Sequence, residues 1–148
     1  IPLVRILINS GINDSGFDSM PVAMANFVAH SMGDIYPLFA PLVGALGAFI
    51  AGSNTVSNMM LSQFQFGVAD ALGISTAFMV ALQAVGAAAG NMIAIHNVVA
   101  ASATVGLLDQ EGETLRKTII PTIYYCLLAG IIGLIGMYYL GLTDPLMK

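Results

Sequence analysis

Charge is scarce in this chain of 148 residues, since 8% of them are Asp, Glu, Lys or Arg and 57% are hydrophobic. A soluble domain usually carries about 25% charged residues. Only 4 residues are Lys or Arg, so little is available to neutralise phosphates, and nucleic acid is not an expected partner. The composition predicts a lipid bilayer around the chain.

Cysteine and catalytic motifs are equally scarce. The single Cys126 can neither build a disulfide framework nor supply a metal cluster, so no metal and no other cofactor is expected. No catalytic triad, Walker loop, HExxH or CxxC pattern occurs, so an enzyme is not expected either. The chain opens on Ile1-Pro2 without an initiator Met or a signal-peptide pattern, which predicts the C-terminal fragment of one membrane domain.

Long uncharged runs are what the sequence has in abundance. Between Asp34 and Asp70 lie 35 residues without Asp, Glu, Lys or Arg, between Asp70 and Asp109 another 38, and between Lys117 and Asp144 another 26. Each run exceeds the roughly 20 residues with which a helix crosses a hydrocarbon core about 30 Å thick. The runs predict an all-α, polytopic membrane protein with three membrane-embedded segments.

The first run is too long for one straight helix, since 35 residues would extend about 52 Å. Polar residues and a glycine interrupt it at residues 52–58. Irregular backbone at membrane depth is tolerated only where protein or a water-filled cavity satisfies its amides. Residues 35–69 are therefore expected to form a re-entrant helical hairpin with its tip near the midplane.

The second run repeats this pattern, because Gly90-Asn91 and His96-Asn97 interrupt an otherwise apolar stretch. It predicts a discontinuous membrane helix over residues 74–108, unwound near residues 90–97. The other segments are expected to be the end of a membrane helix at 1–8, an amphipathic or packed helix at 19–32 and a membrane helix at 118–142. A polar loop is expected at 108–114.

Five polar side chains gather at the first interruption, ahead of a helix expected to start near Ser57 or Asn58. They are Ser53, Asn54, Thr55, Ser57 and Asn58. A helix N-terminus presents unpaired N–H groups and about half a positive charge, which suits a carboxylate. The sequence thus predicts a site for a small monocarboxylate here. The alternative is that Ser57 or Asn58 only caps the helix.

The second interruption is expected to face this tip. It would contribute Gly90, Asn91, His96 and Asn97 to the same substrate-binding site. Paired discontinuous helices near the midplane are the usual architecture of a secondary-transporter site.

Few groups could couple transport to protons. His96 is the titratable group within the interrupted runs, and histidine exchanges a proton near physiological pH. The alternative is a neutral His96 hydrogen-bonded across helices, and the same choice applies to His30. Asp34 and Asp70 flank the hairpin as proton-relay candidates or as solvated interfacial charges.

Two structural expectations concern helix packing. Gln83 is expected to form an interhelical hydrogen bond. Small residues should let helices approach closely, because van der Waals contact draws helices together in lipid. These are Gly44, Gly47, Ala51, Gly130 and Gly133.

Several short strings stand in a particular order along residues 9–142. They are GALGAFIAGSNTVSN at 44–58, Gln63 to Gln65, GNMI at 90–93, ATVGL at 103–107 and Glu111-Gly112. In this order they resemble the L-lactate permease family. Ser-Asn-Thr at 53–55 also resembles the hairpin-tip signature of the broader ion-transporter superfamily, whose members bind carboxylates between two inverted repeats. The chain would then be one half of an inverted repeat.

The resemblance implies uptake of L-lactate, and often D-lactate or glycolate, by proton symport across a prokaryotic plasma membrane. Members of the family can carry Lys where this chain has Asn91, and Ser-Pro-Gln where it has Ala94-Ile95-His96, which leaves substrate preference and proton pathway open. A sodium-coupled carrier of another small carboxylate and a non-transporting membrane subunit remain as alternatives, and so does a homo-oligomeric assembly. A channel would need a continuous polar lining, whereas the polar residues cluster at two interruptions.

Overall fold

The computed structural model describes residues 5–6, 9–14 and 16–141, and every regular element in this part of the chain is helical. The elements in chain order are η1 (Asn9–Gly11), α2 (Met20–Met32), η2 (Gly33–Ile35), α3 (Tyr36–Ala51), α4 (Asn54–Leu72), α5 (Thr76–Gly90), α6 (Ile95–Thr104) and α7 (Glu111–Tyr138). The predicted all-α class is confirmed.

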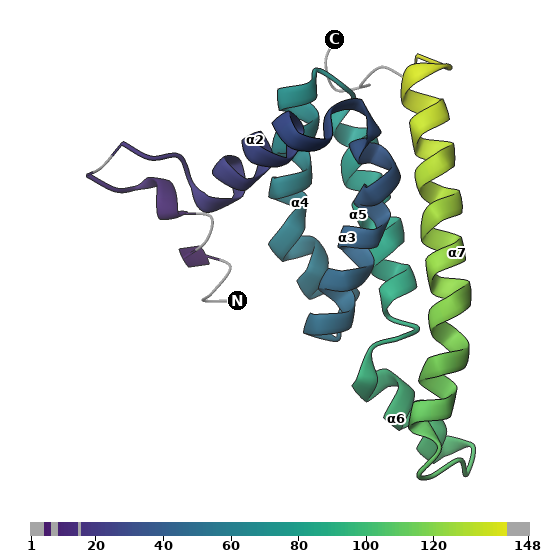
Figure 1. The fold of residues 1–148 in the computed structure, drawn as a ribbon. Helices are drawn as coiled ribbons and strands as arrows, with labels where there is room; N and C mark the ends of the chain where they lie inside the picture. The colour runs from purple at the N-terminus through teal and green to yellow at the C-terminus, as the bar shows by residue number, and fades with distance from the viewer. Residues whose placement is uncertain (1–4, 7–8, 15, 142–148) are drawn as a thin grey trace.

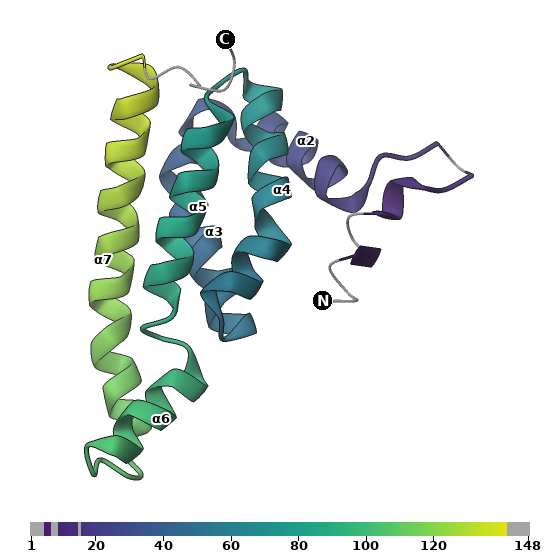
Figure 2. The same ribbon diagram turned by 180° about the vertical axis from the view of Figure 1, so that it is seen from behind.

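Four of the helices form a bundle. Figures 1 and 2 show α3, α4, α5 and α7 side by side, with α2 crossing one end of the bundle and α6 extending beyond the other. α3 packs against α4, α5 and α7. Because the chain runs down α3, up α4, down α5 and up α7, the α3–α4 turn and the α5–α6 break lie at the same end.

The first interruption is a two-residue turn, which makes α3 and α4 a helical hairpin. Gly52 ends α3 in the left-handed conformation (φ 66°), and its N–H donates to the carbonyl of Ala48 at 2.7 Å. Ser53 is extended, and its Oγ accepts a hydrogen bond from the N–H of Val56 at 3.4 Å. Gly52 supplies the helix stop and Ser53 the next helix start, so the chain reverses without further residues.

The expected start of the second arm was wrong. α4 begins at Asn54, and Ser53 is its N-cap, in place of a start or cap near Ser57 or Asn58. The polar residues at 54–58 do not break the helix, because Asn58 Nδ2 donates to Asn54 Oδ1 at 2.9 Å along one turn of it. The interruption is therefore narrower than the sequence pattern indicates.

The second interruption separates α5 from α6, which are bent by 43° relative to each other. The turn covers residues 91–94, so the predicted unwinding at 90–97 was too wide, and His96 and Asn97 lie in the first turn of α6. Ala94 is extended and lets α6 begin at Ile95. Asn97 Nδ2 donates to the carbonyl of Asn91 at 3.2 Å, so one side chain spans the break.

α7 starts earlier than expected, at Glu111, and ends at Tyr138, so the predicted loop at 108–114 and start at 118 were wrong. Glu113 lies in the first turn, where a carboxylate opposes the helix dipole, and it pairs with Lys117 at 2.7 Å. These charged residues stabilise a helical turn despite their polarity. The helix end predicted at 1–8 lies outside the described residues, apart from Arg5 and Ile6. Residue 142, the predicted end of the last helix, also lies outside them.

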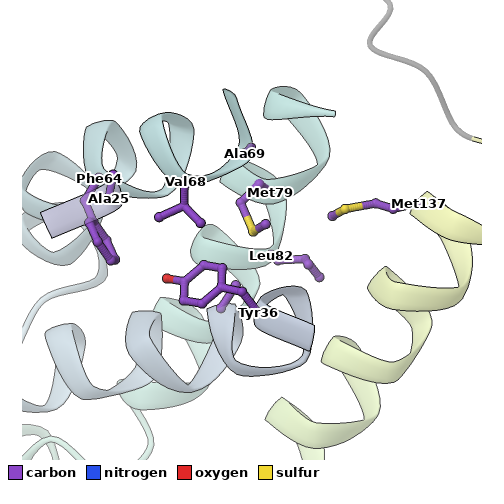
Figure 3. Packing of buried hydrophobic residues seen from close by; sticks show 9 residues of the cluster. Ala25, Tyr36, Phe64, Val68, Ala69, Met79, Leu82 and Met137 are labelled. Carbon is purple, nitrogen blue, oxygen red and sulfur yellow. The ribbon is translucent and has the colours of Figure 1, made fainter. Parts of the chain in front are cut away.

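An apolar core lies where α2, α3, α4 and α5 meet, and α7 adds Met137 to it (Figure 3). Tyr36 and Phe64 stack edge to face, with ring centroids 6.3 Å apart. The buried members of the cluster are Ala25, Tyr36, Ala40, Phe64, Val68, Ala69, Met79, Leu82 and Met137.

Close helix approach depends on glycine, as expected. A Cβ at Gly44 would overlap the carbonyl oxygen of Gln83, and one at Gly86 would overlap the carbonyl of Pro41. Gly130 lies in the same way against the backbone of Leu38, whereas Gly133 lies against the side chain of Leu82. The contacts of Gly44, Gly86 and Gly130 bring backbones together, as is typical of helices in lipid.

Among the described residues, two helical stretches are long and apolar enough to cross a membrane, Met20–Ala51 and Glu111–Tyr138. The bent pair α5 and α6 makes a third if it counts as one span. The expectation of membrane-embedded segments agrees with this result.

Candidate functional site

The hairpin tip and the α5–α6 break meet at one histidine. His96 Nε2 lies 2.8 Å from the carbonyl oxygen of Gly52. The ring covers Gly52 so closely that a Cβ there would overlap it. Of the expected site residues in the second interruption, His96 is thus the one that bonds directly to the tip.

The tip offers hydrogen-bond donors that the fold does not use. Ser53 Oγ caps α4 by accepting a hydrogen bond from the N–H of Val56. Within the described chain, the N–H groups of Asn54 and Thr55 donate no hydrogen bond. Asn54 Oδ1 accepts a hydrogen bond from Asn58, and within the described chain Asn54 Nδ2 donates none. Thr55 is exposed. The start of α4 is therefore a cluster of donors beside the positive end of a helix dipole.

Two carboxamide oxygens near the interruptions are buried and have no hydrogen-bond partner in the described part of the chain, Asn58 Oδ1 and Asn91 Oδ1. Buried polar atoms without a partner are uncommon in folded proteins and invite an explanation. Asn91 caps the end of α5, and its own carbonyl is held by Asn97. The tip and the break thus share a deficit of satisfied polar groups.

Ser57 and Gly90, two further expected site residues, lie inside the bundle. Ser57 is 0% exposed, and its hydroxyl donates to the carbonyl of Gly44 at 3.0 Å. Gly90 is buried against α3, where a Cβ would overlap the carbonyl oxygen of Ala45. Packing and interior hydrogen bonds account for both positions.

A chain of buried polar groups continues inward from Ser57. Gln83 Nε2 donates to Ser57 Oγ at 3.2 Å, and Gln65 Nε2 donates to Gln83 Oε1 at 3.0 Å. The hydroxyl of Tyr36 donates to Gln65 Oε1 at 2.8 Å. The interhelical role predicted for Gln83 is confirmed. Tyr36 was missed, because a tyrosine at the start of an apolar run carries no signal of its partner.

The acidic candidates lie at the opposite end of the hairpin from the tip, because Asp34 lies just before α3 and Asp70 lies in the last turn of α4. Asp34 is exposed and accepts a hydrogen bond from the hydroxyl of Tyr138 at 3.2 Å. Asp70, near the end of α4, is exposed, and so is His30 on α2. With 16 residues in α3, about 24 Å of helix separates its two ends. The structure therefore does not bring these groups together with His96.

A hairpin packed against a broken helix, beside a helix long and apolar enough to cross lipid, defines this fold and site as part of a helical membrane protein. Residues 1–140 match the family model for L-lactate permease. The chain belongs to the L-lactate permease family.

Named relatives agree with this assignment. The chain is 40% identical over 126 residues to a putative L-lactate permease of Haemophilus influenzae, covering 84% of this chain and 24% of the relative. It is 30% identical over 131 residues to the L-lactate permease of Escherichia coli K12, covering 88% of this chain and 24% of the relative. A glycolate permease of the same organism is 30% identical over 124 residues, covering 84% of this chain and 22% of the relative.

The chain thus spans about a quarter of the length of these relatives. No solved structure matches it.

Proposed function

We propose that this chain forms the substrate-binding part of a secondary active transporter that takes up L-lactate by proton symport across a prokaryotic plasma membrane. The observation that carries the proposal is the junction of His96 with the carbonyl of Gly52 at 2.8 Å, where two interrupted helices meet beside a free helix N-terminus. Paired interruptions of this kind are typical of secondary-transporter sites.

The proposal gives the α3–α4 hairpin a re-entrant course in a multi-pass membrane domain. Within the apolar stretch Met20–Ala51, α2 turns across the end of the bundle, and α3 alone has 16 residues, about 24 Å, which is shorter than the roughly 30 Å of a hydrocarbon core. α7 has 28 residues and continues past the tip in Figures 1 and 2. If α7 crosses the membrane, the tip of the hairpin stops within it. One half of an inverted repeat would have this form.

The substrate carboxylate would bind at the start of α4. The N–H groups of Asn54 and Thr55 and the side-chain amide of Asn54 point to an anion, because they are donors at the positive end of a helix dipole. Ser53, Asn58, Asn91 and Asn97 would surround this site. A lactate carboxylate needs no buried arginine there, and the substrate hydroxyl would donate its single proton to the unpaired oxygen of Asn58 or of Asn91.

His96 is the proposed coupling residue. To donate to Gly52, its Nε2 must carry the proton, so Nδ1 is left to accept one from solution. The imidazolium keeps the bond to Gly52 and adds a positive charge beside the carboxylate site. Proton binding would therefore favour substrate binding. Asp34 and Asp70 are weaker candidates, because they lie at the other end of the hairpin.

The neighbouring possibilities differ from this proposal in measurable ways. The glycolate permease among the relatives extends the substrate class to other short 2-hydroxy monocarboxylates. Coupling to sodium would leave uptake insensitive to a proton gradient, and a non-transporting subunit would show no uptake. A homo-oligomer would cover the apolar side chains that α7 leaves exposed, among them Ile120, Leu128 and Ile132.

Uptake of radiolabelled lactate by the full-length protein in proteoliposomes tests the proposal, with proton or sodium gradients imposed separately. We expect uptake driven by the proton gradient, and uptake indifferent to both gradients would remove the symporter. Asn54→Ala should abolish uptake while the protein stays folded in the membrane. Asn26→Ala, at an exposed position of α2, is the matched control and should transport normally.

A further inference from the structure

A single line of hydrogen bonds crosses the interior of the bundle, and all of its donors point the same way. It runs from the hydroxyl of Tyr36 to Gln65, from Gln65 to Gln83, from Gln83 to Ser57, and from Ser57 to the carbonyl of Gly44. Gln65 also donates to the carbonyl of Ala40 at 3.3 Å. The two ends of this line, Tyr36 and Gly44, lie on α3, and its middle residues belong to α4 and α5.

The line is buried throughout. Gln65, Gln83 and Ser57 are 0% exposed and Tyr36 is 1% exposed. A buried polar group costs little when it is bonded and much when a partner is removed, because the remaining group is left without water. The four side chains therefore form a unit that fixes the register of three helices.

This unit reaches the hairpin tip directly. The N–H of Ser57 donates to the carbonyl of Ser53 at 2.9 Å, and Ser53 is the residue that caps α4. A Cβ at Gly47 would lie 2.5 Å from the serine Oγ, so the glycine at 47 leaves the space against α3 that the Ser57 hydroxyl occupies. The position of the cap thus depends on where Gln83 holds Ser57.

We propose that Gln83 is a positioning residue that sets the hairpin tip against α5 through Ser57, and so controls substrate affinity from inside the bundle. It touches no substrate. Gln65 completes the same line from α4. This inference rests on the proposed function, and it adds residues that the interruptions alone do not point to.

The test compares Gln83→Leu and Gln83→Glu with wild type in lactate uptake by reconstituted full-length protein. Leucine removes both hydrogen bonds. We expect it to raise KM by about tenfold or more, the usual effect of unpairing a buried group. Mere loss of folded protein would instead lower Vmax at constant KM. Gln63→Leu, at an exposed position of the same helix as Gln65, should leave KM unchanged.

Glutamate supplies a pH readout that a packing role would not give. A neutral carboxyl accepts from Gln65 and donates to Ser57, as the amide does, whereas an ionised one cannot donate and is buried as a charge. The KM of Gln83→Glu, divided by the wild-type KM at the same pH, should therefore fall toward one as the pH falls, whereas loss of folded protein would change Vmax alone. The ratio for Gln83→Leu should stay flat.

Dividing by wild type cancels the pH dependence that the variant and the wild type share. Within the described residues, Tyr36 on α3 is the ionisable side chain bonded into the line, and α4, α5 and α7 add no charged side chain to it. A wild-type KM in Gln83→Leu, or a flat ratio for Gln83→Glu, would overturn the inference. If wild type itself transports no lactate, that result contradicts the proposed function but does not test the positioning role of Gln83. The rate at which a small maleimide alkylates Thr55→Cys at the tip, compared in folded protein with and without Gln83→Leu, then decides the positioning claim: a changed rate supports it and an unchanged rate overturns it.

Discussion

The interior line and the hairpin tip are both rich in polar side chains, but they treat hydrogen bonds differently. Along Tyr36, Gln65, Gln83 and Ser57 each side chain has a partner, and three helices are held in register. At the tip, the N–H groups of Asn54 and Thr55 and the oxygen of Asn58 are without one in the described chain. Satisfied polar groups hold a fold together, whereas unsatisfied ones are available to a ligand. The tip is accordingly where we expect chemistry and the interior line where we expect support.

Gly52 is the position where a change should harm the tip most. Gly52→Ala strains a left-handed residue, and its methyl group would also displace the ring of His96. Because misplacing a site by about 1 Å can cost roughly a hundredfold, we expect lactate uptake to fall by at least about that factor. Initial uptake rates in proteoliposomes measure it.

The control is Gly73→Ala, since Gly73 has nearly the same φ (67°) but nothing within 4 Å of its Cβ. It carries the same backbone strain without the overlap. Equal losses in the two variants would show that strain alone, without the contact to His96, explains the effect.

The next largest effect should come from His96. His96→Gln keeps a donor for the carbonyl of Gly52 but has no group that titrates near neutral pH. We expect the variant to exchange lactate across the membrane while losing most of its stimulation by a proton gradient. Counterflow and gradient-driven uptake, measured side by side, separate the two activities.

His30→Gln removes the other histidine, which is exposed on α2, and should behave as wild type. Gradient-driven uptake that persists in His96→Gln would assign proton coupling to another residue.

Helix packing should respond less strongly than the tip does. Gly86→Ala places a methyl group against the carbonyl of Pro41, and overpacking of this kind costs about 1–3 kcal/mol of unfolding free energy. The melting temperature of the full-length protein in detergent should fall accordingly.

Gly112→Ala, in the first turn of α7 with open space around it, should be neutral or stabilising by up to about 1 kcal/mol. Matching melting temperatures for the two variants would contradict the close approach of α3 and α5.

The smallest effect is expected at the far end of the hairpin. Tyr138→Phe removes the hydrogen bond to Asp34, which is exposed, so stability should change by less than about 1 kcal/mol. Proton-driven uptake should be unaffected, as it should be in Asp34→Asn.

Tyr139→Phe, at a neighbouring side chain that is 82% exposed, is the control. Loss of proton coupling in Asp34→Asn would show that this carboxylate takes part in proton transport.

The sequence predicted the helical class, the two interruptions and the close packing at Gly44 and Gly133. Each of these follows from a local feature of the sequence, either a long uncharged run or a small residue within it. The sequence pattern misjudged where helices start. Asn58 looks like a helix breaker, but its side-chain bond to Asn54 one turn away keeps it helical. The start of α7 looks like a polar loop, but Glu113 and Lys117 pair there along one turn of helix.

The candidate site was only partly predictable for a different reason. That His96 would meet Gly52, and that Ser57 would turn inward to Gln83, depends on how α4, α5 and α6 pack in three dimensions. His96 and Gly52 are separated by 44 positions in the sequence, and Gln83 and Ser57 by 26. Spacing along the chain does not predict contacts at such separations.

The most direct test of the central claim is whether lactate covers the tip. In full-length protein with its reactive cysteines replaced, Thr55→Cys should be alkylated by a small maleimide, and saturating lactate should slow that reaction, whereas Thr104→Cys at the exposed end of α6 should react at one rate throughout. Slower alkylation at position 55 alone is the predicted result. An alkylation rate there that saturating lactate leaves unchanged, in protein that still takes up lactate, would contradict the claim that the hairpin tip binds the substrate.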